Sequence, residues 1–291
     1  MKNELTITVI GGDRRQIESI HLLLNMGHKV NAFGFDNLLD SRVNLASEIE
    51  ERMFNCQVLL LPIPYKDEEG NINMKESNRK VPLKAIMEYA EKYKPLVVLG
   101  KPDKVFMDLA MEKEIDYLDL TNDEAFAVLN SIPTAEGAIW RAMDMTEYTI
   151  HGSKALVLGY GRIGKSLSRM LKGIGARVTV AARRRDDLAW IVENGYTAVH
   201  LKDLDDILPS QNIIFNTIPH LILNREKLLK VDKGAVIIDL SSYPGGVDFV
   251  AARELKLEAS LDLGLPGKVA PKTAAEIIVK VMMDSLQERM T

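Results

Sequence analysis

Short apolar runs alternate with longer segments of helical periodicity along the first half of the chain. Five runs rich in β-branched residues indicate strands at positions 5–10, 29–34, 57–63, 95–100 and 115–120. After the first run, apolar residues recur at helical spacing from Ile17 to Leu24, and Gly27 closes the segment. The polar stretch 65–80 lacks periodicity and predicts a loop or a hairpin. This alternation favours βαβ units around a parallel sheet.

The same pattern returns later in the chain. Six further strand candidates lie at 154–159, 177–182, 197–201, 212–217, 235–240 and 257–263. Between the two series, Pro133 and Thr134 predict the start of a helix that continues to about Tyr148. At the end of the chain, apolar positions from Ile277 to Leu286 suit an amphipathic helix that packs back on the first half.

We therefore expect an α/β fold with two doubly wound parallel-sheet domains, the second with the Rossmann layout, and a C-terminal helix packing on the first. The expected parts are an N-terminal α/β domain on the substrate side at 1–130, a linker helix at 131–150, a Rossmann domain at 151–270 and a C-terminal helix at 271–291. Because 46% of the 291 residues are hydrophobic, the chain can bury a sizeable core.

Charge and cysteine content narrow the possible partners and compartments. A formal net charge of -4 argues against nucleic acid as the main partner, because phosphate binding needs a broad basic face. The single cysteine, Cys56, allows no intrachain disulfide and fits a reducing compartment. No apolar run approaches the roughly 18–20 residues of a membrane span, and the N-terminus does not resemble a signal peptide. We expect a cytoplasmic protein without membrane contact.

A glycine pattern between two strand candidates predicts a dinucleotide site. Gly159, Gly161 and Gly164 form Gly-x-Gly-x-x-Gly directly after a strand and at the start of a helix, with a second strand following on schedule. The first glycine permits the tight turn, the second lets the backbone approach a pyrophosphate, and the third permits close helix–strand packing. The alternative is a glycine turn in an ordinary βαβ unit.

Three arginines stand where an NAD-preferring site has a carboxylate. The strand 177–182 runs directly into Arg183, Arg184 and Arg185, and the first acids, Asp186 and Asp187, come later. An arginine fork can bind a phosphate dianion and stack on adenine, so we expect NADP as the cofactor. The alternative is a solvated basic helix start paired with the two acids, which the helix dipole disfavours.

Two later stretches, "NTIPH" from Asn216 and "DLSSYPGG" from Asp239, follow strands at their carboxyl ends, where this fold binds ligands. They could equally be simple strand ends. The residues expected to line the cofactor are Gly159, Gly161, Arg162, Ile163, Gly164, Arg183, Arg184, Arg185, Thr217, Ile218, Pro219, Ser241 and Tyr243. The sequence assigns no catalytic residue: His220 and Glu136 are the candidates, and His220 could as well be a solvent-facing loop residue.

The first half offers a possible anion site for the substrate. Its loop Gly12-Asp13-Arg14 follows a strand and begins a helix, although it lacks the third glycine of a dinucleotide fingerprint. Thr134 and Lys268 are further substrate candidates in irregular stretches. Capping and surface charge are the competing explanations for all of these residues. No His, Cys or carboxylate spacing suggests a metal.

Several segments together resemble a known family. The motifs "VIGGDRR", "SIPTAEGAI", "LVLGYGRIGK", "NTIP", "DLSSYPGG" and "LGLPGKVAPKTAA" closely resemble, in order, those of the A subunits of bacterial dipicolinate synthase. The second half is also similar in layout to D-2-hydroxyacid dehydrogenases and S-adenosylhomocysteine hydrolases. The resemblance implies oxidation of the dihydrodipicolinate-level intermediate of the lysine pathway to dipicolinate. It also implies a flavoprotein-like B subunit, an oligomeric assembly and the mother-cell cytoplasm of sporulating cells.

The residues fit this reaction in two respects. Arg14 and Lys268 could bind a dicarboxylate, with hydride passing to NADP+ across a cleft between the halves. Aromatisation of the ring supplies driving force, which reduces the need for a strong base. No histidine follows His220, where 2-hydroxyacid dehydrogenases place their base, and this departure counts against lactate-like substrates. The alternatives are a related oxidoreductase acting on another small carboxylate and a non-catalytic NADP-binding subunit.

Overall fold

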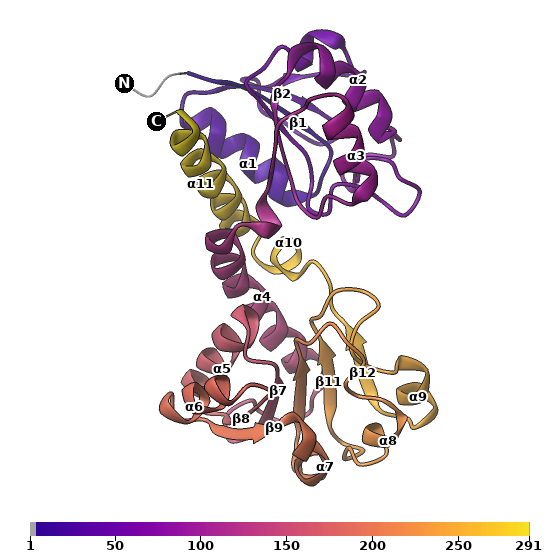
Figure 1. Ribbon diagram of the computed structural model, residues 1–291, viewed down its shortest axis with the longest axis vertical. Helices are drawn as coiled ribbons and strands as arrows, with labels where there is room; N and C mark the ends of the chain where they lie inside the picture. Colours follow the sequence, from indigo (N-terminus) through magenta and orange to yellow (C-terminus); the bar gives the residue numbers. More distant parts are fainter. Residues whose placement is uncertain (1–3, 291) are drawn as a thin grey trace. The chain divides into compact units, whose positions relative to one another are not determined.

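A computed structural model describes residues 4–290 of the chain. The chain divides into two compact units (Figure 1), the first of which includes both the indigo start of the chain and the yellow helix at its end. Unit 1 comprises Met1–Leu129 and Ala270–Thr291, and unit 2 comprises Asn130–Val269. The C-terminal segment thus returns to the unit in which the chain began. Each unit is built around its own sheet.

The sheet of unit 1 has six parallel strands in the order β3-β2-β1-β4-β5-β6. The strands are β1 (Thr6–Ile10), β2 (Lys29–Phe33), β3 (Asn44–Leu45), β4 (Val58–Leu60), β5 (Leu96–Leu99) and β6 (Tyr117–Asp119). The helices are α1 (Arg14–Asn25), η1 (Glu51–Phe54), α2 (Leu83–Tyr93), α3 (Lys104–Glu112), η2 (Leu120–Asn122) and α11 (Pro271–Met290).

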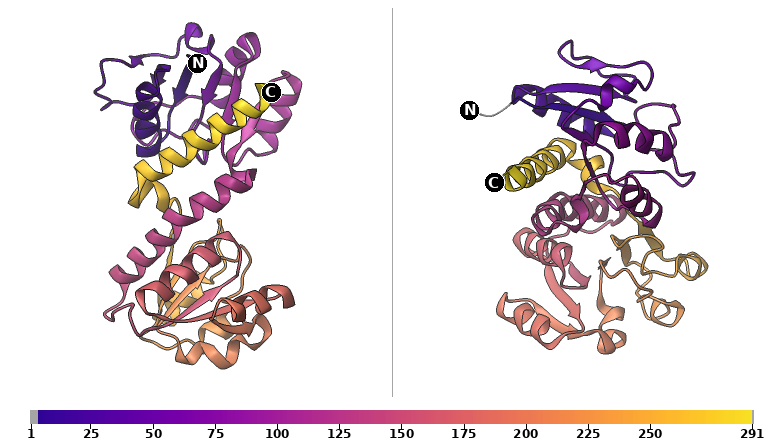
Figure 2. Two further views of the ribbon diagram at one scale, coloured as in Figure 1. Left: turned by 90° about the vertical axis from the view of Figure 1, so that its left-hand side faces the viewer. Right: turned by 45° about the horizontal axis from the view of Figure 1, so that its top comes forward.

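Alternate residues of the central strands in unit 1 face two separate cores. Ile7 and Val9 of β1 pack with α1 and α11 on one face of the sheet, and Ile10 packs with α2 and α3 on the other. Helix α11 lies beside α1, as Figure 1 and the left view of Figure 2 show. This confirms the expected doubly wound sheet with the C-terminal helix packed on the first half.

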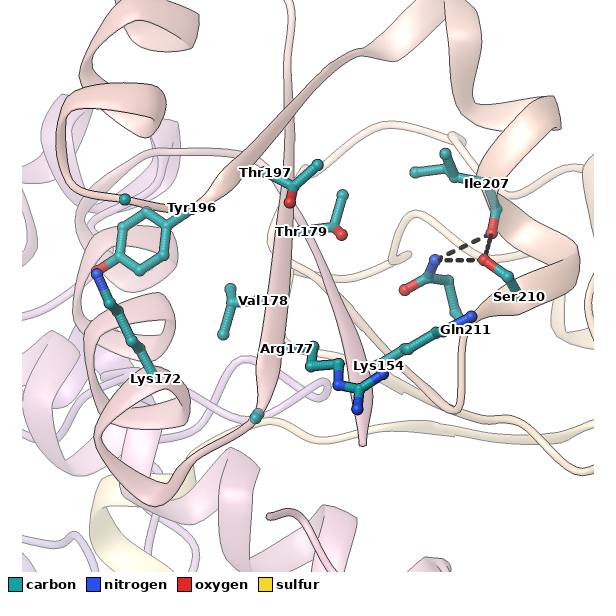
Figure 3. A pocket seen from close by; sticks show the side chains of 12 residues that line it. Lys154, Lys172, Arg177, Val178, Thr179, Tyr196, Thr197, Ile207, Ser210 and Gln211 are labelled. Atoms are coloured by element: carbon teal, nitrogen blue, oxygen red, sulfur yellow. Dashed lines mark hydrogen bonds between the residues drawn. The ribbon is translucent and has the colours of Figure 1, made fainter. Parts of the chain in front are cut away.

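Unit 2 repeats the same strand order along the sheet, β9-β8-β7-β10-β11-β12, again all parallel. Its strands are β7 (Lys154–Leu158), β8 (Arg177–Ala182), β9 (Thr197–His200), β10 (Ile213–Asn216), β11 (Val236–Asp239) and β12 (Glu258–Leu261). Its principal helices are α5 (Arg162–Ile174), α6 (Arg185–Glu193), α7 (Leu204–Ile207), α8 (Arg225–Leu228), α9 (Phe249–Glu254) and α10 (Leu265–Val269). A hollow lies at the amino ends of β7, β8 and β9 (Figure 3).

Two cores again cover the two faces of this sheet. Val157 and Phe215 pack against α5 and α6 on one face, whereas Leu156 and Ile214 pack against α7, α8 and α9 on the other. The expected Rossmann architecture of this half is therefore confirmed. Because all six strands run parallel, their carboxyl ends share one edge, and the glycine turn and the arginines lie there.

One local expectation was wrong. Pro133 and Thr134 do not begin a helix, because both lie inside α4, which spans Glu124–Met145. The helix starts where the side chain of Asp123 accepts a hydrogen bond from the amide of Phe126, 2.7 Å away. The hydroxyl of Thr134 donates to the carbonyl of Asn130 at 2.7 Å, one turn back along the same helix. The segment 131–150, expected as a linker, thus begins within a longer helix.

The polar stretch 65–80 contains a short hairpin. Antiparallel bridges pair Lys66 with Ile72 and Asn71 with Pro82, and Gly70 takes a positive φ at the turn. A parallel bridge between Gly12 and Met74 holds the returning strand against the loop after β1. The hairpin therefore lies over the glycine turn of unit 1.

Candidate dinucleotide site

The three glycines of the turn after β7, Gly159, Gly161 and Gly164, differ in how closely other atoms approach them, and two of them leave no room for a side chain. Gly159 has a φ of +98°, and a Cβ there would come within 2.5 Å of the hydroxyl oxygen of Thr217. A Cβ on Gly164 would come within 2.1 Å of the carbonyl oxygen of Gly159, so helix α5 can approach the turn only without a side chain there. These contacts are the physical reason for the first and third glycines.

The second glycine differs, because the space that a side chain would occupy there is open. A Cβ on Gly161 would meet no atom within 4 Å, and its φ of -79° is open to any residue. Gly161 is also the N-cap of the 13-residue helix α5, and no side chain caps this end. The first turn of the helix therefore presents backbone N–H groups and the positive end of its dipole to open space. This arrangement fits a pyrophosphate and leaves room for it.

The arginines at the end of β8 are exposed, and one of them is already paired. Arg184 is the N-cap of α6, and its guanidinium binds the carboxylate of Asp186 through two hydrogen bonds. Asp187 lies 4.0 Å from the same guanidinium. Pairing with Asp186 raises the pKa of Arg184 and lowers that of Asp186. For Arg183 and Arg185, no ion pair is recorded among the described residues. A phosphate at this end would compete with Asp186 for Arg184.

The ends of β10 and β11 are joined by a buried carboxylate that sequence reasoning did not single out. Asp239 has no exposed surface, and its Oδ1 accepts hydrogen bonds from the Asn216 amide at 2.9 Å and from the Ser241 hydroxyl at 2.7 Å. Its Oδ2 accepts from the amide of Gly246 at 2.6 Å. Asn216 also donates to the carbonyl of Ile218 at 3.0 Å. These bonds fix the two loops that border the strand ends.

The structure brings only part of the predicted set into this network. Thr217 donates to the carbonyl of Leu158 at 2.8 Å, which ties its loop to the glycine turn. Ile218 is half-buried and Ser241 is buried, whereas Pro219, His220 and Tyr243 are exposed. The side chain of His220 takes part in no hydrogen bond or ion pair recorded for the described residues. The sequence analysis named the two stretches that begin at Asn216 and Asp239, but it did not predict the hydrogen bond that joins these residues at the ends of two neighbouring buried strands.

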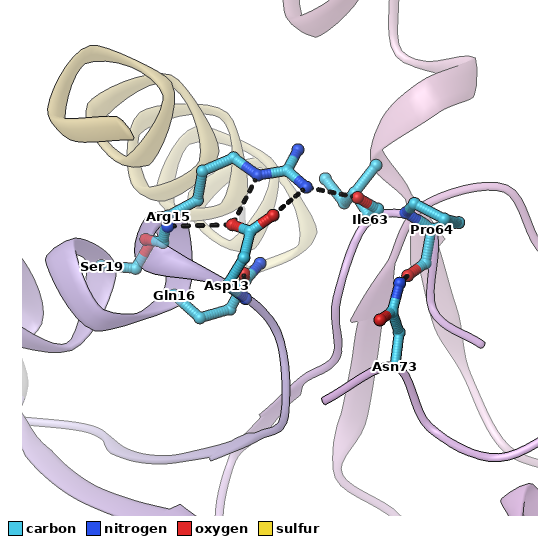
Figure 4. A network of polar contacts seen from close by, with 7 residues as sticks. All are labelled: Asp13, Arg15, Gln16, Ser19, Ile63, Pro64 and Asn73. Atoms are coloured by element: carbon cyan, nitrogen blue, oxygen red, sulfur yellow. Dashed lines mark hydrogen bonds and ion pairs between the residues drawn. The ribbon is translucent and has the colours of Figure 1, made fainter. Parts of the chain in front are cut away.

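The loop after β1 in unit 1 is closed by its own side chains (Figure 4). Asp13 caps α1 by accepting a hydrogen bond from the Arg15 amide at 3.0 Å, and Gln16 accepts from the Asp13 amide at 3.0 Å. The amide of Gly12 donates to the carbonyl of Asn73 in the hairpin, 2.7 Å away. The turn donors are therefore largely satisfied within the unit, and side chains would have to bind any anion here.

Arg15, which sequence reasoning passed over, is the buried arginine of this loop, whereas Arg14 is exposed. The Nε and Nη2 atoms of Arg15 donate to the two carboxylate oxygens of Asp13, each at 2.9 Å. The same Nη2 also donates to the carbonyl of Ile63 at 2.5 Å. Burial raises the pKa of Asp13, but the hydrogen bonds and charge of Arg15 outweigh it and lower the pKa overall. The sequence signal available for this closed loop was the D-x-x-Q pattern of a capping box, formed by Asp13 and Gln16.

A second polar cluster of unit 1 lies where β4 and β5 end. Asp103 caps α3 through the amide of Phe106 at 3.1 Å, and it accepts a hydrogen bond from the Tyr65 hydroxyl at 2.7 Å. The ammonium of Lys66 binds the other carboxylate oxygen. Burial raises the pKa of Asp103, but these donors lower it overall to about 2. Burial and the adjacent carboxylate raise the pKa of Tyr65.

The remaining predicted residues lie in helices of unit 2. Thr134 is buried in α4, Glu136 is exposed on the same helix, and Lys268 is exposed in α10. None of them shares a recorded hydrogen bond with the glycine turn or the strand-end network among the described residues. Gly137, next to Glu136, lets α4 approach Leu265, whose Cβ would lie 2.8 Å from an added side chain. This stretch therefore has a clear packing role.

Comparisons with known protein families identify the class of protein to which this chain belongs. Residues 130–242 match the family model described as "D-isomer specific 2-hydroxyacid dehydrogenase, NAD binding domain". Residues 6–121 match the family model of the N-terminal domain of the dipicolinate synthase A subunits. Unit 2 is thus a nicotinamide-dinucleotide domain, and the chain is an NAD(P)-dependent oxidoreductase.

The whole chain aligns with dipicolinate synthase A subunits at more than 30% identity. The dipicolinate synthase A subunit of Bacillus subtilis (strain 168) is 36% identical over 290 residues, which cover 99% of this chain and 98% of that protein. The crystal structure of the dipicolinate synthase A subunit from Bacillus halodurans has a TM-score of 0.88 at 35% identity, covering 97% of both chains. The crystal structure of the Bacillus subtilis protein has a TM-score of 0.87 at 34% identity, covering 99% of this chain and 97% of that one. The chain belongs to the family of dipicolinate synthase A subunits.

No helix of the described residues is long and apolar enough to cross a membrane.

Proposed function

We propose that this chain oxidises a dihydrodipicolinate-level intermediate of the lysine pathway to dipicolinate, with NADP+ as the hydride acceptor. It would act as the A subunit of a synthase with a flavoprotein-like second subunit, in the mother-cell cytoplasm during sporulation. The observation that carries the proposal is the uncapped glycine turn at Gly161, with arginines at the end of the next strand, in a chain of this family. The family membership supports the substrate, and the arginines support the choice of NADP.

On this proposal, different groups at the carboxyl ends of the unit 2 strands bind different parts of the cofactor. The N–H groups after Gly161 hold the pyrophosphate, and Arg183 with Arg184 hold the 2′-phosphate of the adenosine ribose. The loops fixed by Asp239 border the nicotinamide half. The bound cofactor supplies a hydride acceptor. The substrate ring loses a hydride and a proton and becomes aromatic, so the chain needs to orient the ring more than to remove a tightly held proton.

Arg14 and Lys268 are the proposed partners of the two substrate carboxylates, with Gly12, Asp13 and Thr134 in supporting positions. Both cations are exposed, and neither has an ion pair recorded among the described residues. Replacing either with alanine is expected to raise KM for the substrate about tenfold or more, because a charge-assisted hydrogen bond is lost. Arg253→Ala, at an exposed cation of α9, is the matched control. Unchanged steady-state kinetics in both variants would remove Arg14 and Lys268 from the site.

The choice of NADP is tested by nucleotide affinity. Arg183→Ala combined with Arg184→Ala is expected to weaken NADPH binding by about tenfold to a hundredfold and to leave NADH binding nearly unchanged, since only NADPH carries the 2′-phosphate. Asp186→Asn is expected to strengthen NADPH binding, because Arg184 is then released from its carboxylate. Calorimetric titration of both nucleotides checks this. Equal affinities for NADPH and NADH, unaffected by the arginine variants, would show that the site does not select NADP.

A non-catalytic role for the NADP-bound chain is the second candidate. It is favoured by one observation: no histidine is hydrogen-bonded to a carboxylate within the described part of unit 2. The deciding experiment supplies the lysine-pathway intermediate and NADP+ to the chain alone and to the chain with its second subunit. We expect NADPH and dipicolinate to form together, and the absorbance of each product measures this. Dipicolinate formation without nucleotide reduction would favour the regulatory role instead.

A further inference from the structure

The edge of the unit 2 sheet opposite the glycine turn carries a basic hollow. It has a volume of about 590 Å³ and lies at the amino ends of β7, β8 and β9. Its walls include three cations, Lys154, Lys172 and Arg177, and no carboxylate is among its lining residues. Two threonine hydroxyls, of Thr179 and Thr197, lie on adjacent strands in direct register. A chain with a net charge of -4 thus gathers positive charge here, at the opposite edge of the sheet from Arg183, Arg184 and Arg185.

The two cations on the strands are held together by the sheet itself. Lys154 and Arg177 are the first residues of β7 and β8 and are register partners in that parallel pair. Like charges on neighbouring strands destabilise a sheet unless something lies between them to neutralise them. Neither side chain has an ion pair or hydrogen bond recorded among the described residues, and Figure 3 shows both at the same end of the hollow. An anion seated between them would remove this repulsion.

The other walls are ordered and polar. Lys172 donates to the carbonyl of Asn194 at 2.8 Å and lies 5.2 Å from the centre of the Tyr196 ring, so its charge is held at the rim. Gln211 is 4% exposed, and its amide donates to the carbonyl of Ile207 and to the hydroxyl of Ser210, each at 3.0 Å. Among residues 4–290, no group donates a hydrogen bond to its Oε1, which is buried. A buried acceptor without a partner is unfavourable, so a group that donates hydrogen bonds would complete this wall.

We propose that the basic hollow is a second ligand site, separate from the dinucleotide site, for a small phosphate-bearing metabolite with hydroxyl groups. The phosphate binds between Lys154 and Arg177, near Lys172. Hydroxyl groups of the ligand reach the threonines and the Gln211 side. This site lies at the amino ends of strands whose carboxyl ends carry the glycine turn and the arginines, so it does not depend on the proposed dehydrogenation.

Site-resolved NMR titration of the full chain tests the proposal. Inorganic phosphate, glycerol 3-phosphate and glycerol are added separately at constant ionic strength. We expect saturable shifts at the amides of Thr179, Gly195 and Thr197 with both phosphates, tighter with glycerol 3-phosphate, and none with glycerol. Shifts confined to the turn after Gly161 would place all phosphate at the dinucleotide site and overturn the proposal. So would shifts that grow linearly without saturation.

Charge variants provide the second arm of the test. Lys154→Gln combined with Arg177→Gln is expected to weaken glycerol 3-phosphate binding by at least about fivefold, since two charges are lost. Lys202→Gln combined with Lys256→Gln removes the same charge from exposed sites of unit 2 outside the hollow and is expected to change nothing. Thr197→Glu, at an exposed position, places a carboxylate in the hollow and is expected to abolish binding. Equal affinity in all of these variants would overturn the proposal.

Discussion

At the scale of single residues, the glycines of unit 2 separate what folding needs from what binding needs. Gly164 has no room for a side chain because the carbonyl of Gly159 stands 2.1 Å from where its Cβ would lie. A Cβ on Gly161 would meet no atom within 4 Å, and its φ is ordinary. Gly164 is therefore required by the packing of α5, whereas packing does not require Gly161, and we propose that a ligand does.

This difference predicts opposite outcomes for two alanine variants. Gly161→Ala is expected to change the free energy of unfolding by less than about 1 kcal/mol but to weaken nucleotide binding severely, since the methyl group fills the approach to the pyrophosphate. Gly164→Ala is expected to destabilise unit 2 by several kcal/mol, because α5 must move away. Urea unfolding and NADPH titration measure the two effects. If Gly161→Ala bound NADPH like the parent chain, the turn would not be a pyrophosphate site.

The ionisation of Asp103 is linked to its hydrogen bonds. Its pKa of about 2 lies below the 3.8 of an unperturbed aspartate, so its charge stabilises the folded state fully above about pH 4. That contribution is lost as the pH falls from 3.8 towards 2. Tyr65→Phe removes one donor and is expected to raise the pKa of Asp103, with a smaller loss of stability in acid. Tyr117→Phe, on a ring that packs against Phe106 without a recorded hydroxyl bond, is the control. NMR titration of the Asp103 carboxyl carbon checks both, and identical titrations would exclude a role for the Tyr65 hydroxyl.

At the scale of elements, the strands were predictable and the helix ends were less so. Long buried strands such as β8 carry their own apolar signal, and its predicted bounds of 177–182 are those observed. Strand β3 has two exposed residues and no pattern to detect. Pro133 indicated a helix start because proline favours a first turn, yet the buried Ala135 and Ala138 hold α4 together through it. Asp123 was the true start signal.

The glycine turn was predictable from spacing, whereas the Asp239 network depends on contacts between loops 23 residues apart in sequence.

The strand-end network predicts a large cost for altering its carboxylate. Asp239→Asn replaces one acceptor oxygen by an NH2 group, so the amide of Gly246 or the hydroxyl of Ser241 loses its partner inside the protein. We expect a loss of about 2–4 kcal/mol in the free energy of unfolding, because buried donors are left unsatisfied. Asp248→Asn keeps a capping oxygen at a less buried position and is the control. Urea unfolding compares them, and equal small effects would mean that the network does not fix the loops.

At the scale of the whole molecule, one topology occurs twice with different consequences. Both sheets have the same strand order, and in both a glycine turn follows the central strand and begins a helix. In unit 1 the helix is capped by Asp13 and the turn is covered by Asn73, whereas in unit 2 the helix end is bare. The fold alone therefore does not decide where a dinucleotide binds. We expect the N-cap residue to decide it: Asp13 caps α1 in unit 1, whereas Gly161 leaves α5 without a side-chain cap in unit 2.

The return of the chain to unit 1 through α11 predicts a stability effect confined to that unit. Ile278 is 1% exposed and belongs to the core that includes Ile20 and Leu23 of α1. Ile278→Ala is expected to cost unit 1 about 2–5 kcal/mol, as for other large-to-small changes in a core. Hydrogen exchange followed by mass spectrometry is expected to show lower protection in β1 and β4 and unchanged protection in β7 and β10, because each unit has its own core. Glu276→Ala, on the exposed side of α11, is expected to change neither. Equal losses in both units would mean that they unfold as one, and no loss in β1 would mean that α11 does not hold the first sheet.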